Sequence, residues 1–428
     1  MDGNKLKQIL LDQMEELDTN AIPHLCHRKE EDLVDLSSHL AQVVIGVRRC
    51  GKSTLCKNVL SKSKVAFGYV NFDDERLTDL RTEDLDDVLK TLYQIHGDIA
   101  YFFFDEIQNV KSWELFVNRL LRQGKHLLIT GSNSKLLADD LATHLTGRHN
   151  KIELLPFSFA EYCNYKGVKT VPRTTKNIGL IARAFDEYFE LGGMPELLTE
   201  GNPTAYIDAL FENIIKQDIK KRFKVRNIES LRRIAQHLLN ISPSIIRRPR
   251  LCELFEVKSP VTMDHYLSYL SQAYLTLPLT KYSNKSSMRT QSEKAYAIDV
   301  AFMNKRHEAF AGVNLGWRLE TMVYLELRRR MRHASQDIYY FATQKTECDF
   351  VTADGNVVTG LYQVCYDISN GKTRKREIAG CVSAAQATGC KNVALITANQ
   401  AETIETAGIT IRCIPAWEWM LETPAIKI

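Results

Sequence analysis

Residues 46–53 (GVRRCGKS) have the spacing of a phosphate-binding loop, because Gly46, Gly51, Lys52 and Ser53 complete the pattern G-x-x-x-x-G-K-[ST]. Glycine is expected at both bends, since backbone N–H groups must reach phosphate oxygens without an intervening side chain. Lys52 is predicted to reach the β- and γ-phosphates and Ser53 to ligate Mg²⁺. A helix opened by Thr54 would direct its positive end at the anion. The motif predicts binding of a nucleoside triphosphate.

The predicted contacts with the nucleotide extend over the whole loop. Cys50 lies inside it, and we expect its thiol to be exposed and oxidisable when the site is empty. The residues predicted to bind the nucleotide are Gly46, Cys50, Gly51, Lys52, Ser53 and Thr54.

Two carboxylates follow at a spacing that suits the same site. Four consecutive aromatic residues, 101–104, lead into Asp105 and Glu106, and Asp105 lies 53 positions after Lys52. Such a run predicts a buried strand with both carboxylates at its end. We expect Asp105 to act with Ser53 in holding Mg²⁺ and its waters, and Glu106 to polarise the attacking water.

Two further residues could sense the γ-phosphate. An apolar strand at 126–130 runs into Ser132 and Asn133, and either side chain could contact the γ-phosphate or the water. Asn133 or Ser134 could instead cap the helix that follows. Arg148 could stabilise charge on the transferring phosphoryl group, within its own subunit or in a neighbour, or could be an ordinary exposed arginine. The predicted catalytic residues are Lys52, Glu106, Asn133 and Arg148.

Five apolar segments would position these residues. They fall at 43–45, 65–72, 100–106, 126–130 and 151–155, with helical stretches between them. This alternation predicts an α/β domain with a parallel sheet. We expect one strand to be inserted between the two strands that carry the nucleotide motifs.

Composition limits the class of protein. The chain has 428 residues, enough for about two to four domains, with 44% hydrophobic and 25% charged residues. It has no apolar run of the roughly eighteen residues that a membrane helix needs, and its first residues do not resemble a secretory signal. The ten cysteines form no CxxC pair, which predicts reduced thiols in a cytoplasmic protein. A net charge of +4 is too small to indicate a nucleic-acid partner.

Several motifs in order resemble those of a family of prokaryotic AAA+-like ATPases with a C-terminal domain of unknown function. They are GVRRCGKSTL, NFDDERL, FFFDEIQNV, TGSNSKLL, LTGRH, ELLPFSFAEY and LGGMPE. The resemblance implies a P-loop NTPase fold with sheet order 5-1-4-3-2, and ATP with Mg²⁺ as cofactors. It implies an ATPase domain at 1–165, a helical and winged-helix region at 175–285, and a nuclease-like α/β domain at 290–428.

Basic residues cluster twice in the predicted middle region. Six lie within the eleven residues 216–226, where a solvated helix face and a phosphate-contacting patch are both open interpretations. Arg247, Arg248 and Arg250 are expected in a basic turn that could contact DNA phosphates. The presumed recognition helix has no Lys or Arg between positions 261 and 274. This favours packing or oligomerisation slightly over DNA binding.

The last part of the chain resembles a PD-(D/E)XK nuclease core. The resemblance implies that Glu320, Asp349 and Gln363 ligate Mg²⁺. Cys365 stands at the lysine position and cannot supply a cation, so the site is expected to be inactive unless Lys345 or Lys372 substitutes.

These observations predict Mg²⁺-dependent ATP hydrolysis coupled to a conformational change that acts on DNA or on a protein partner. One alternative is a nucleotide-gated binding module with negligible turnover. A less favoured one is an ATP-controlled nuclease. The chain could form oligomers, and no membrane partner is expected.

Overall fold

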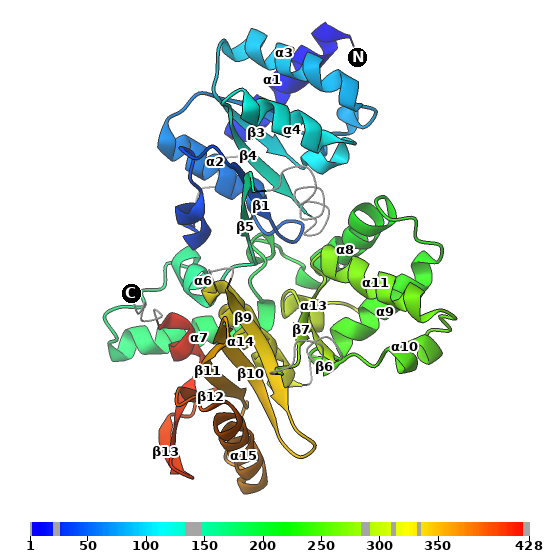
Figure 1. Cartoon of the computed structure of the whole chain (residues 1–428). Coiled ribbons are helices and arrows are strands. Elements are labelled where there is room, and N and C mark those ends of the chain that lie inside the picture. Colours follow the sequence, from blue (N-terminus) through cyan, green and yellow to red (C-terminus); the bar gives the residue numbers. More distant parts are fainter. Residues whose placement is uncertain are drawn as a thin grey trace. The chain divides into compact units, whose positions relative to one another are not determined.

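The computed structural model describes residues 2–19, 26–132, 147–283, 292–309, 314–331 and 335–422. These form two compact units. The first comprises residues 1–154 with 272–274, and the second comprises 155–271 with 275–428 (Figure 1). The first unit thus ends before the predicted boundary at 165, and residues on either side of the predicted boundary at 285–290 belong to one unit. None of the described helices is long and apolar enough to cross a membrane.

The first unit is built on a five-stranded parallel sheet. Its order is β2-β3-β4-β1-β5, so β4 lies between the strands that carry the two nucleotide motifs, as predicted. All five residues of β1 are buried, and four of them are apolar. The exception is Gln42, whose amide hydrogen-bonds to the Leu40 carbonyl oxygen and to Asn150. The strands are β1 (Ala41–Ile45), β2 (Phe67–Asn71), β3 (Tyr101–Asp105), β4 (His126–Gly131) and β5 (His149–Glu153).

Helices alternate with these strands. Helix α2 begins at Lys52, two residues before the predicted start, and lies against β1 and β4. Helix α1 packs on α3 and β2 through a stripe that includes Leu6, Ile9 and Leu10. The α-helices are α1 (Gly3–Thr19), α2 (Lys52–Ser63), α3 (Leu85–His96) and α4 (Trp113–Arg122). The short 3-10 helices are η1 (Lys29–Leu33), η2 (Glu75–Leu77), η3 (Thr82–Asp84) and η4 (Ile107–Asn109).

The second unit begins with helices and a small antiparallel sheet of order β6-β8-β7. Its helices are α6 (Phe159–Tyr165), α7 (Thr175–Leu191), η5 (Glu196–Leu198), α8 (Pro203–Asn213), the π-helix η6 (Ile214–Lys220), α9 (Ile228–Asn240), α10 (Arg248–Leu254) and α11 (Pro260–Gln272). The strands are β6 (Ser244–Ile245), β7 (Thr276–Thr280) and β8 (Glu293–Ala297).

The predicted basic turn is wrong. Arg248 and Arg250 lie in the first turn of α10, and Arg247 precedes it as the N-cap residue. Pro249 does not prevent this, because the first N–H groups of a helix have no intrahelical partner to lose. Arg248 is also engaged in ion pairs, with Asp264 at 2.5 Å and Glu293 at 2.5 Å.

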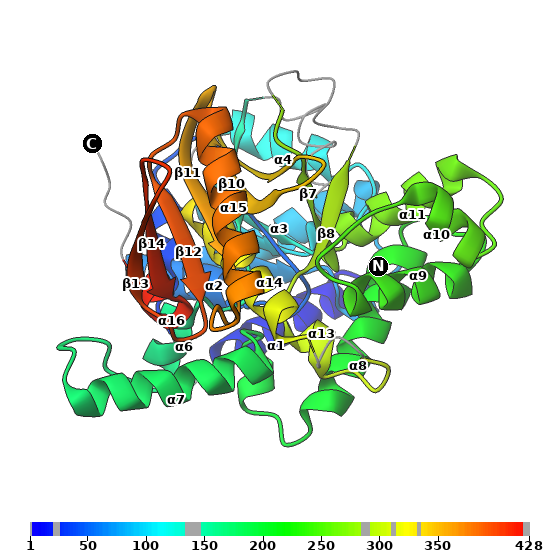
Figure 2. The ribbon, with the colours of Figure 1, turned by 90° about the horizontal axis from the view of Figure 1, so that it is seen from below.

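The rest of the second unit contains a six-stranded mixed sheet of order β13-β14-β12-β11-β10-β9. Helix α15 lies along β10, β11 and β12 of this sheet (Figure 2). The strands are β9 (Gln336–Ala342), β10 (Glu347–Asp354), β11 (Val357–Val364), β12 (Val393–Thr397), β13 (Glu402–Thr406) and β14 (Ile409–Pro415). The helices are α13 (Ala301–Asn304), α14 (Leu315–Arg330), α15 (Gly371–Thr388) and α16 (Ala416–Leu421).

The glycine pair of the LGGMPE motif allows a close approach inside the second unit. A Cβ on Gly193 would lie 2.3 Å from the carbonyl oxygen of Phe157, and one on Gly192 would lie 1.8 Å from Asp299 Oδ1. Gly193 N donates a hydrogen bond to Asp299 Oδ2 at 2.8 Å, and Ala301 N donates to Oδ1 at 2.8 Å. Burial raises the pKa of Asp299 to about 6.

Replacing Gly193 with alanine should destabilise the chain by about 2–3 kcal/mol, because the obstructing atom is backbone and cannot move aside. Gly179→Ala is the matched control. Gly179 lies inside α7 with nothing within 4 Å of an added Cβ, so alanine there should stabilise by roughly 0.5–1 kcal/mol. Chemical denaturation of both variants checks this, and equal effects would contradict the steric explanation.

Candidate nucleotide-binding site

The loop between β1 and α2 is shaped by close packing and by two left-handed residues. A Cβ on Gly46 would lie 2.1 Å from the carbonyl oxygen of Leu154, so this position has no room for a side chain. Arg49 and Gly51 have φ values of 66° and 97°. Gly51 is the N-cap of α2, and no side chain caps this helix end. The first N–H groups of α2 are therefore available to an anion.

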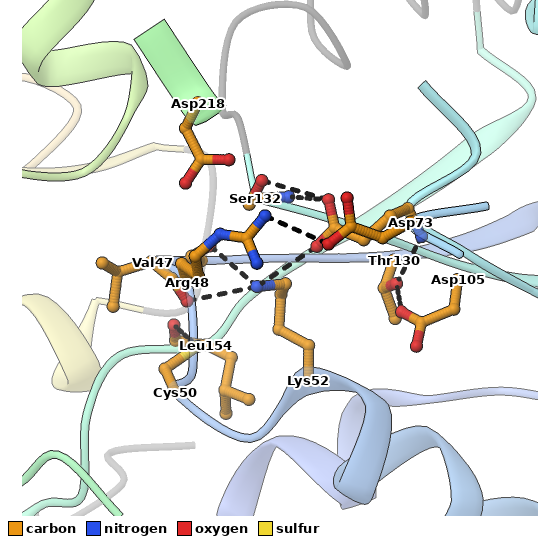
Figure 3. Close-up of polar contacts among 12 residues, drawn as sticks. Val47, Arg48, Cys50, Lys52, Asp73, Asp105, Thr130, Ser132, Leu154 and Asp218 are labelled. Atoms are coloured by element: carbon orange, nitrogen blue, oxygen red, sulfur yellow. Dashed lines mark hydrogen bonds and ion pairs between the residues drawn. The ribbon is translucent and has the colours of Figure 1, made fainter. Parts of the chain in front are cut away.

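Lys52 is held inside the loop. Its side chain is buried, and its Nζ donates hydrogen bonds to the carbonyl oxygens of Gly46 at 3.2 Å and Val47 at 3.1 Å. The same ammonium lies 3.7 Å from Glu106 Oε1. Figure 3 shows Lys52 directed at this group of oxygens. A positive charge is thus positioned where the loop would receive phosphates.

Asp105 and Ser53, the two predicted metal ligands, are brought together by the end of β3 and the start of α2. The Thr130 hydroxyl donates a hydrogen bond to Asp105 (Figure 3). The Ser53 side chain hydrogen-bonds to the same carboxylate. Burial and the neighbouring Glu106 carboxylate raise the pKa of Asp105, while these hydrogen bonds and the Lys52 ammonium oppose the rise. A serine hydroxyl beside a buried carboxylate is a donor set that fits Mg²⁺.

Glu106 has a left-handed backbone, with φ of 53°, directly after β3. Its N–H donates to Thr130 Oγ1 at 3.1 Å. Its Oε2 accepts hydrogen bonds from the Ser132 N–H at 3.2 Å, the Ser132 hydroxyl at 3.0 Å and the Gln108 amide. Asn133, the other predicted γ-phosphate contact, lies outside the described residues.

Arg148 is exposed at the surface, whereas Cys50 is buried inside the phosphate loop. Arg148 is exposed and donates a hydrogen bond to Asn118 at 2.9 Å. The expectation that Cys50 is exposed in the empty site is wrong. Cys50 is fully buried, and its thiol donates to the carbonyl oxygen of Leu154 at 3.4 Å. The loop packs against the chain after β5, and burial raises the pKa of the Cys50 thiol.

Sequence reasoning missed two residues that support the loop. Thr130 links Asp105 to the backbone of Glu106, as described above. Arg28, which is buried, donates from Nη1 to the carbonyl oxygen of Cys50 at 3.2 Å. Helix η1 is also tied to α2, because Lys62 Nζ lies 2.7 Å from Glu31 Oε2. Arg28 belongs to no sequence motif, so its contact with the phosphate loop could not be predicted.

A second charged cluster lies in the other unit and is centred on a lysine that the sequence did not suggest. Lys294 of β8 has its Nζ 3.0 Å from Glu320, 2.6 Å from Glu347 and 3.8 Å from Asp349. Burial opposes the charge of this ammonium, but the three carboxylates outweigh burial and raise the pKa of Lys294. Tyr296 also donates to Glu320 at 2.7 Å.

The other residues of the predicted nuclease-like site, Gln363 and Cys365, are hydrogen-bonded within the second unit. Gln363 Oε1 accepts from the Asp349 N–H at 3.2 Å, and its Nε2 donates to Glu377 at 2.6 Å. The Cys365 thiol donates to the carbonyl oxygen of Asp367 at 3.3 Å. Lys345 and Lys372, the expected substitutes, are exposed and make no ion pair within the described residues.

The cluster does not fit a metal ion. Across the part of the chain that the structure describes, no three His, Cys, Asp or Glu side chains are arranged to hold one. The ammonium of Lys294 instead occupies the position between the carboxylates.

Comparisons with known proteins agree with the fold of the first unit. Residues 38–163 match the model of an AAA domain, and residues 182–312 match a domain of unknown function (DUF8612). The uncharacterized protein MJ1544 of Methanocaldococcus jannaschii is 32% identical over 403 residues, which cover 91% of this chain and 90% of that protein. The chain belongs to the family of MJ1544. Its first unit is an AAA-type domain with a P-loop fold.

Other similar proteins are more distant. An uncharacterized protein of Haemophilus influenzae is 26% identical over 366 residues, covering 82% of this chain and 86% of that protein. The RuvB Holliday junction branch migration motor of Thermotoga maritima has 16% identity and a TM-score of 0.28, covering 56% of this chain and 81% of RuvB. AMPPCP-bound DnaA from Aquifex aeolicus has 14% identity and a TM-score of 0.26, covering 56% and 85%. At these TM-scores the two structures add nothing to the assignment of function.

Thr130→Val should destabilise the MJ1544-family chain by about 1–3 kcal/mol, because valine keeps the shape but leaves the Glu106 N–H and a buried oxygen of Asp105 without this partner. Chemical denaturation measures the effect. Thr78→Val is the control, since Thr78 is exposed and its loss should change stability by less than about 0.5 kcal/mol. Equal stabilities of the two variants would contradict the bridging role of Thr130.

Lys294→Met should cost about 3–5 kcal/mol of stability, because it leaves buried carboxylates uncompensated. Adding Glu320→Gln to that variant should recover part of the loss. Lys305→Met, which removes an ion pair to the half-exposed Glu190, should cost at most about 1 kcal/mol. Thermal denaturation with and without Mg²⁺ measures all three, and restoration of the Lys294→Met variant by Mg²⁺ would show that a metal can hold the cluster.

Proposed function

We propose that this chain is a Mg²⁺-dependent ATPase. The observation that carries the proposal is the convergence of Lys52, the Ser53–Asp105 pair and Glu106 at one end of the parallel sheet. The groups come from two segments, the start of α2 and the end of β3, and together they have the chemistry that phosphoryl transfer to water requires. The match of residues 38–163 to an AAA domain supports the same interpretation.

The residues have separate roles in this proposal. The N–H groups of the loop and Lys52 bind the β- and γ-phosphates, and Ser53 with Asp105 holds the metal. Bound Mg²⁺ supplies positive charge to the phosphate oxygens. Glu106 orients the attacking water and accepts its proton. Arg148 and Asn133 are assigned to the γ-phosphate, with Arg148 acting from its own subunit or from a neighbouring one.

The geometry of Glu106 suggests how hydrolysis is restrained before nucleotide binds. Its Oε2 accepts three hydrogen bonds while its Oε1 faces the Lys52 ammonium. A carboxylate engaged in this way has fewer lone pairs available to orient an attacking water. Phosphates that attract Lys52 would remove one of these interactions. In this proposal, the free energy of ATP binding and hydrolysis drives a conformational change that acts on a DNA or protein partner.

A nucleotide-gated binding module with negligible turnover is the second candidate, and it uses the same binding residues. Glu106 distinguishes the two, because a module that does not hydrolyse ATP has no need of a residue that activates water. Nuclease activity is not part of the proposal, because Lys294 already fills the space between the carboxylates.

Glu106→Gln should lower ATP turnover by about 10²–10⁴-fold while leaving nucleotide affinity close to that of the wild type. Lys52→Ala should instead weaken nucleotide binding itself. Phosphate release and fluorescent-nucleotide titration separate the two effects. Glu83→Gln is the matched control, because Glu83 is exposed and pairs only loosely with Arg81, at 3.6 Å.

The outcomes distinguish the two candidates. Wild-type turnover that Glu106→Gln abolishes establishes the ATPase. Tight nucleotide binding with no turnover above the Glu106→Gln background would establish the binding module instead. Unchanged binding and turnover in Lys52→Ala would contradict both.

A further inference from the structure

The second unit has a surface on which positive charge is concentrated and left unneutralised. Six cationic side chains lie between Lys216 and Arg226, spanning η6 and the turn that follows it. Lys216 pairs with Glu212 at 3.3 Å and Arg222 with the buried Asp218 at 3.8 Å. The other four, which we term the basic segment, are exposed and form no ion pair within the described ranges. They are Lys220, Lys221, Lys224 and Arg226.

The basic segment is held in a defined place and is not a loose tail. Phe223 stacks on Tyr269 of α11, with ring centroids 4.1 Å apart and planes 11° apart. Tyr266 of the same helix donates from its hydroxyl to the carbonyl oxygen of Asn227 at 3.3 Å. Backbone hydrogen bonds within 219–225 close the turn. Fixing like charges close together costs energy that a polyanion would recover.

Helix α11 itself explains why the positive charge comes from its neighbours. Between Pro260 and Gln272 it carries no Lys or Arg. Its exposed side chains include Val261 and His265, and the His265 ring stacks on Tyr269. In the same half of the helix, Asp264 pairs with Arg248 of α10, which is flanked in sequence by the exposed Arg247 and lies near the exposed Arg250 of the same helix turn. An apolar and aromatic helix face therefore lies beside cations supplied by two flanking segments.

We propose that the basic segment and the exposed face of α11 bind the phosphate backbone of a nucleic acid. The fit is one of charge complementarity, because four unpaired cations within seven residues match the closely spaced phosphates of a strand. The exposed His265, whose ring stacks on Tyr269, is an aromatic residue of the kind on which an unpaired base packs. The inference rests on the proposed function in one respect, because it makes nucleic acid the partner on which the ATPase acts. Binding of the nucleic acid does not itself require ATP hydrolysis.

The test compares two variants of the full chain that lose the same charge. One replaces Lys220, Lys221, Lys224 and Arg226 with alanine. The control replaces four exposed lysines that also form no ion pair within the described ranges, namely Lys169, Lys176, Lys375 and Lys391. Fluorescence anisotropy follows binding to a labelled DNA duplex and to a single strand of the same sequence, each about 30 nucleotides long, at several salt concentrations.

The wild type and the control variant should bind with the same salt dependence. The basic-segment variant should bind at least about tenfold more weakly near 0.1 M salt. The slope of log K against log[salt] should become shallower by about 3–4, one unit for each lost phosphate contact. Tighter binding of the single strand would assign the stacked rings a role with bases, and tighter binding of the duplex would assign recognition to the phosphates alone.

Three results would overturn the inference: no binding by the wild type, equal weakening in both variants, or no change in the basic-segment variant. ATP turnover measured on the same samples keeps the two proposals apart. Loss of nucleic-acid binding with turnover retained would reject the surface alone. Salt-dependent binding without any turnover would reject the ATPase alone.

Discussion

The site depends on the position of β4 between β1 and β3. Register along this part of the sheet pairs Thr130 with Val44 on one side and Ile129 with Phe104 on the other. The Thr130 hydroxyl therefore lies beside Asp105 at the point where the phosphate loop leaves β1 (Figure 3). Parallel strands end at one edge of a sheet, so this order gathers residues that are distant in sequence without a long connecting loop. A slip of one residue would turn these side chains to the opposite face.

The two buried lysines, Lys52 and Lys294, have their charges compensated by different groups. In the AAA-type unit, Lys52 is balanced by loop carbonyls and by Glu106, and the arrangement leaves the helix end open to an anion. In the second unit, Lys294 is surrounded by carboxylates on three sides and by the Tyr340 ring. The first cluster borders the N-terminus of α2, which no side chain caps and which favours negative charge. In the second cluster the Lys294 ammonium pairs directly with the three carboxylates, which suits a structural role.

Local patterns account for what could be predicted from sequence. The phosphate loop and the buried strand ending in Asp105 follow from a motif and an unbroken apolar run, and the sheet order follows from the family resemblance. Lys294 and Arg28 could not be found in this way, because each acts through a contact with a segment far away in the chain. The arginines of α10 were predicted to lie in a turn because proline is common in turns. Proline is also accepted in the first turn of a helix, where Pro249 lies.

Asp299 accepts a hydrogen bond from Gly193, and its raised pKa makes the stability of the second unit depend on pH in an unusual direction. Its pKa of about 6 lies above the value near 4 of an unfolded chain. The folded state therefore binds the proton more tightly than the unfolded state does. The stability from this group is fully present below about pH 4 and is lost as the pH rises through 6. Mild acidification lowers the stability of most proteins, because it protonates paired carboxylates. Protonation of Asp299 would instead raise the stability of the second unit.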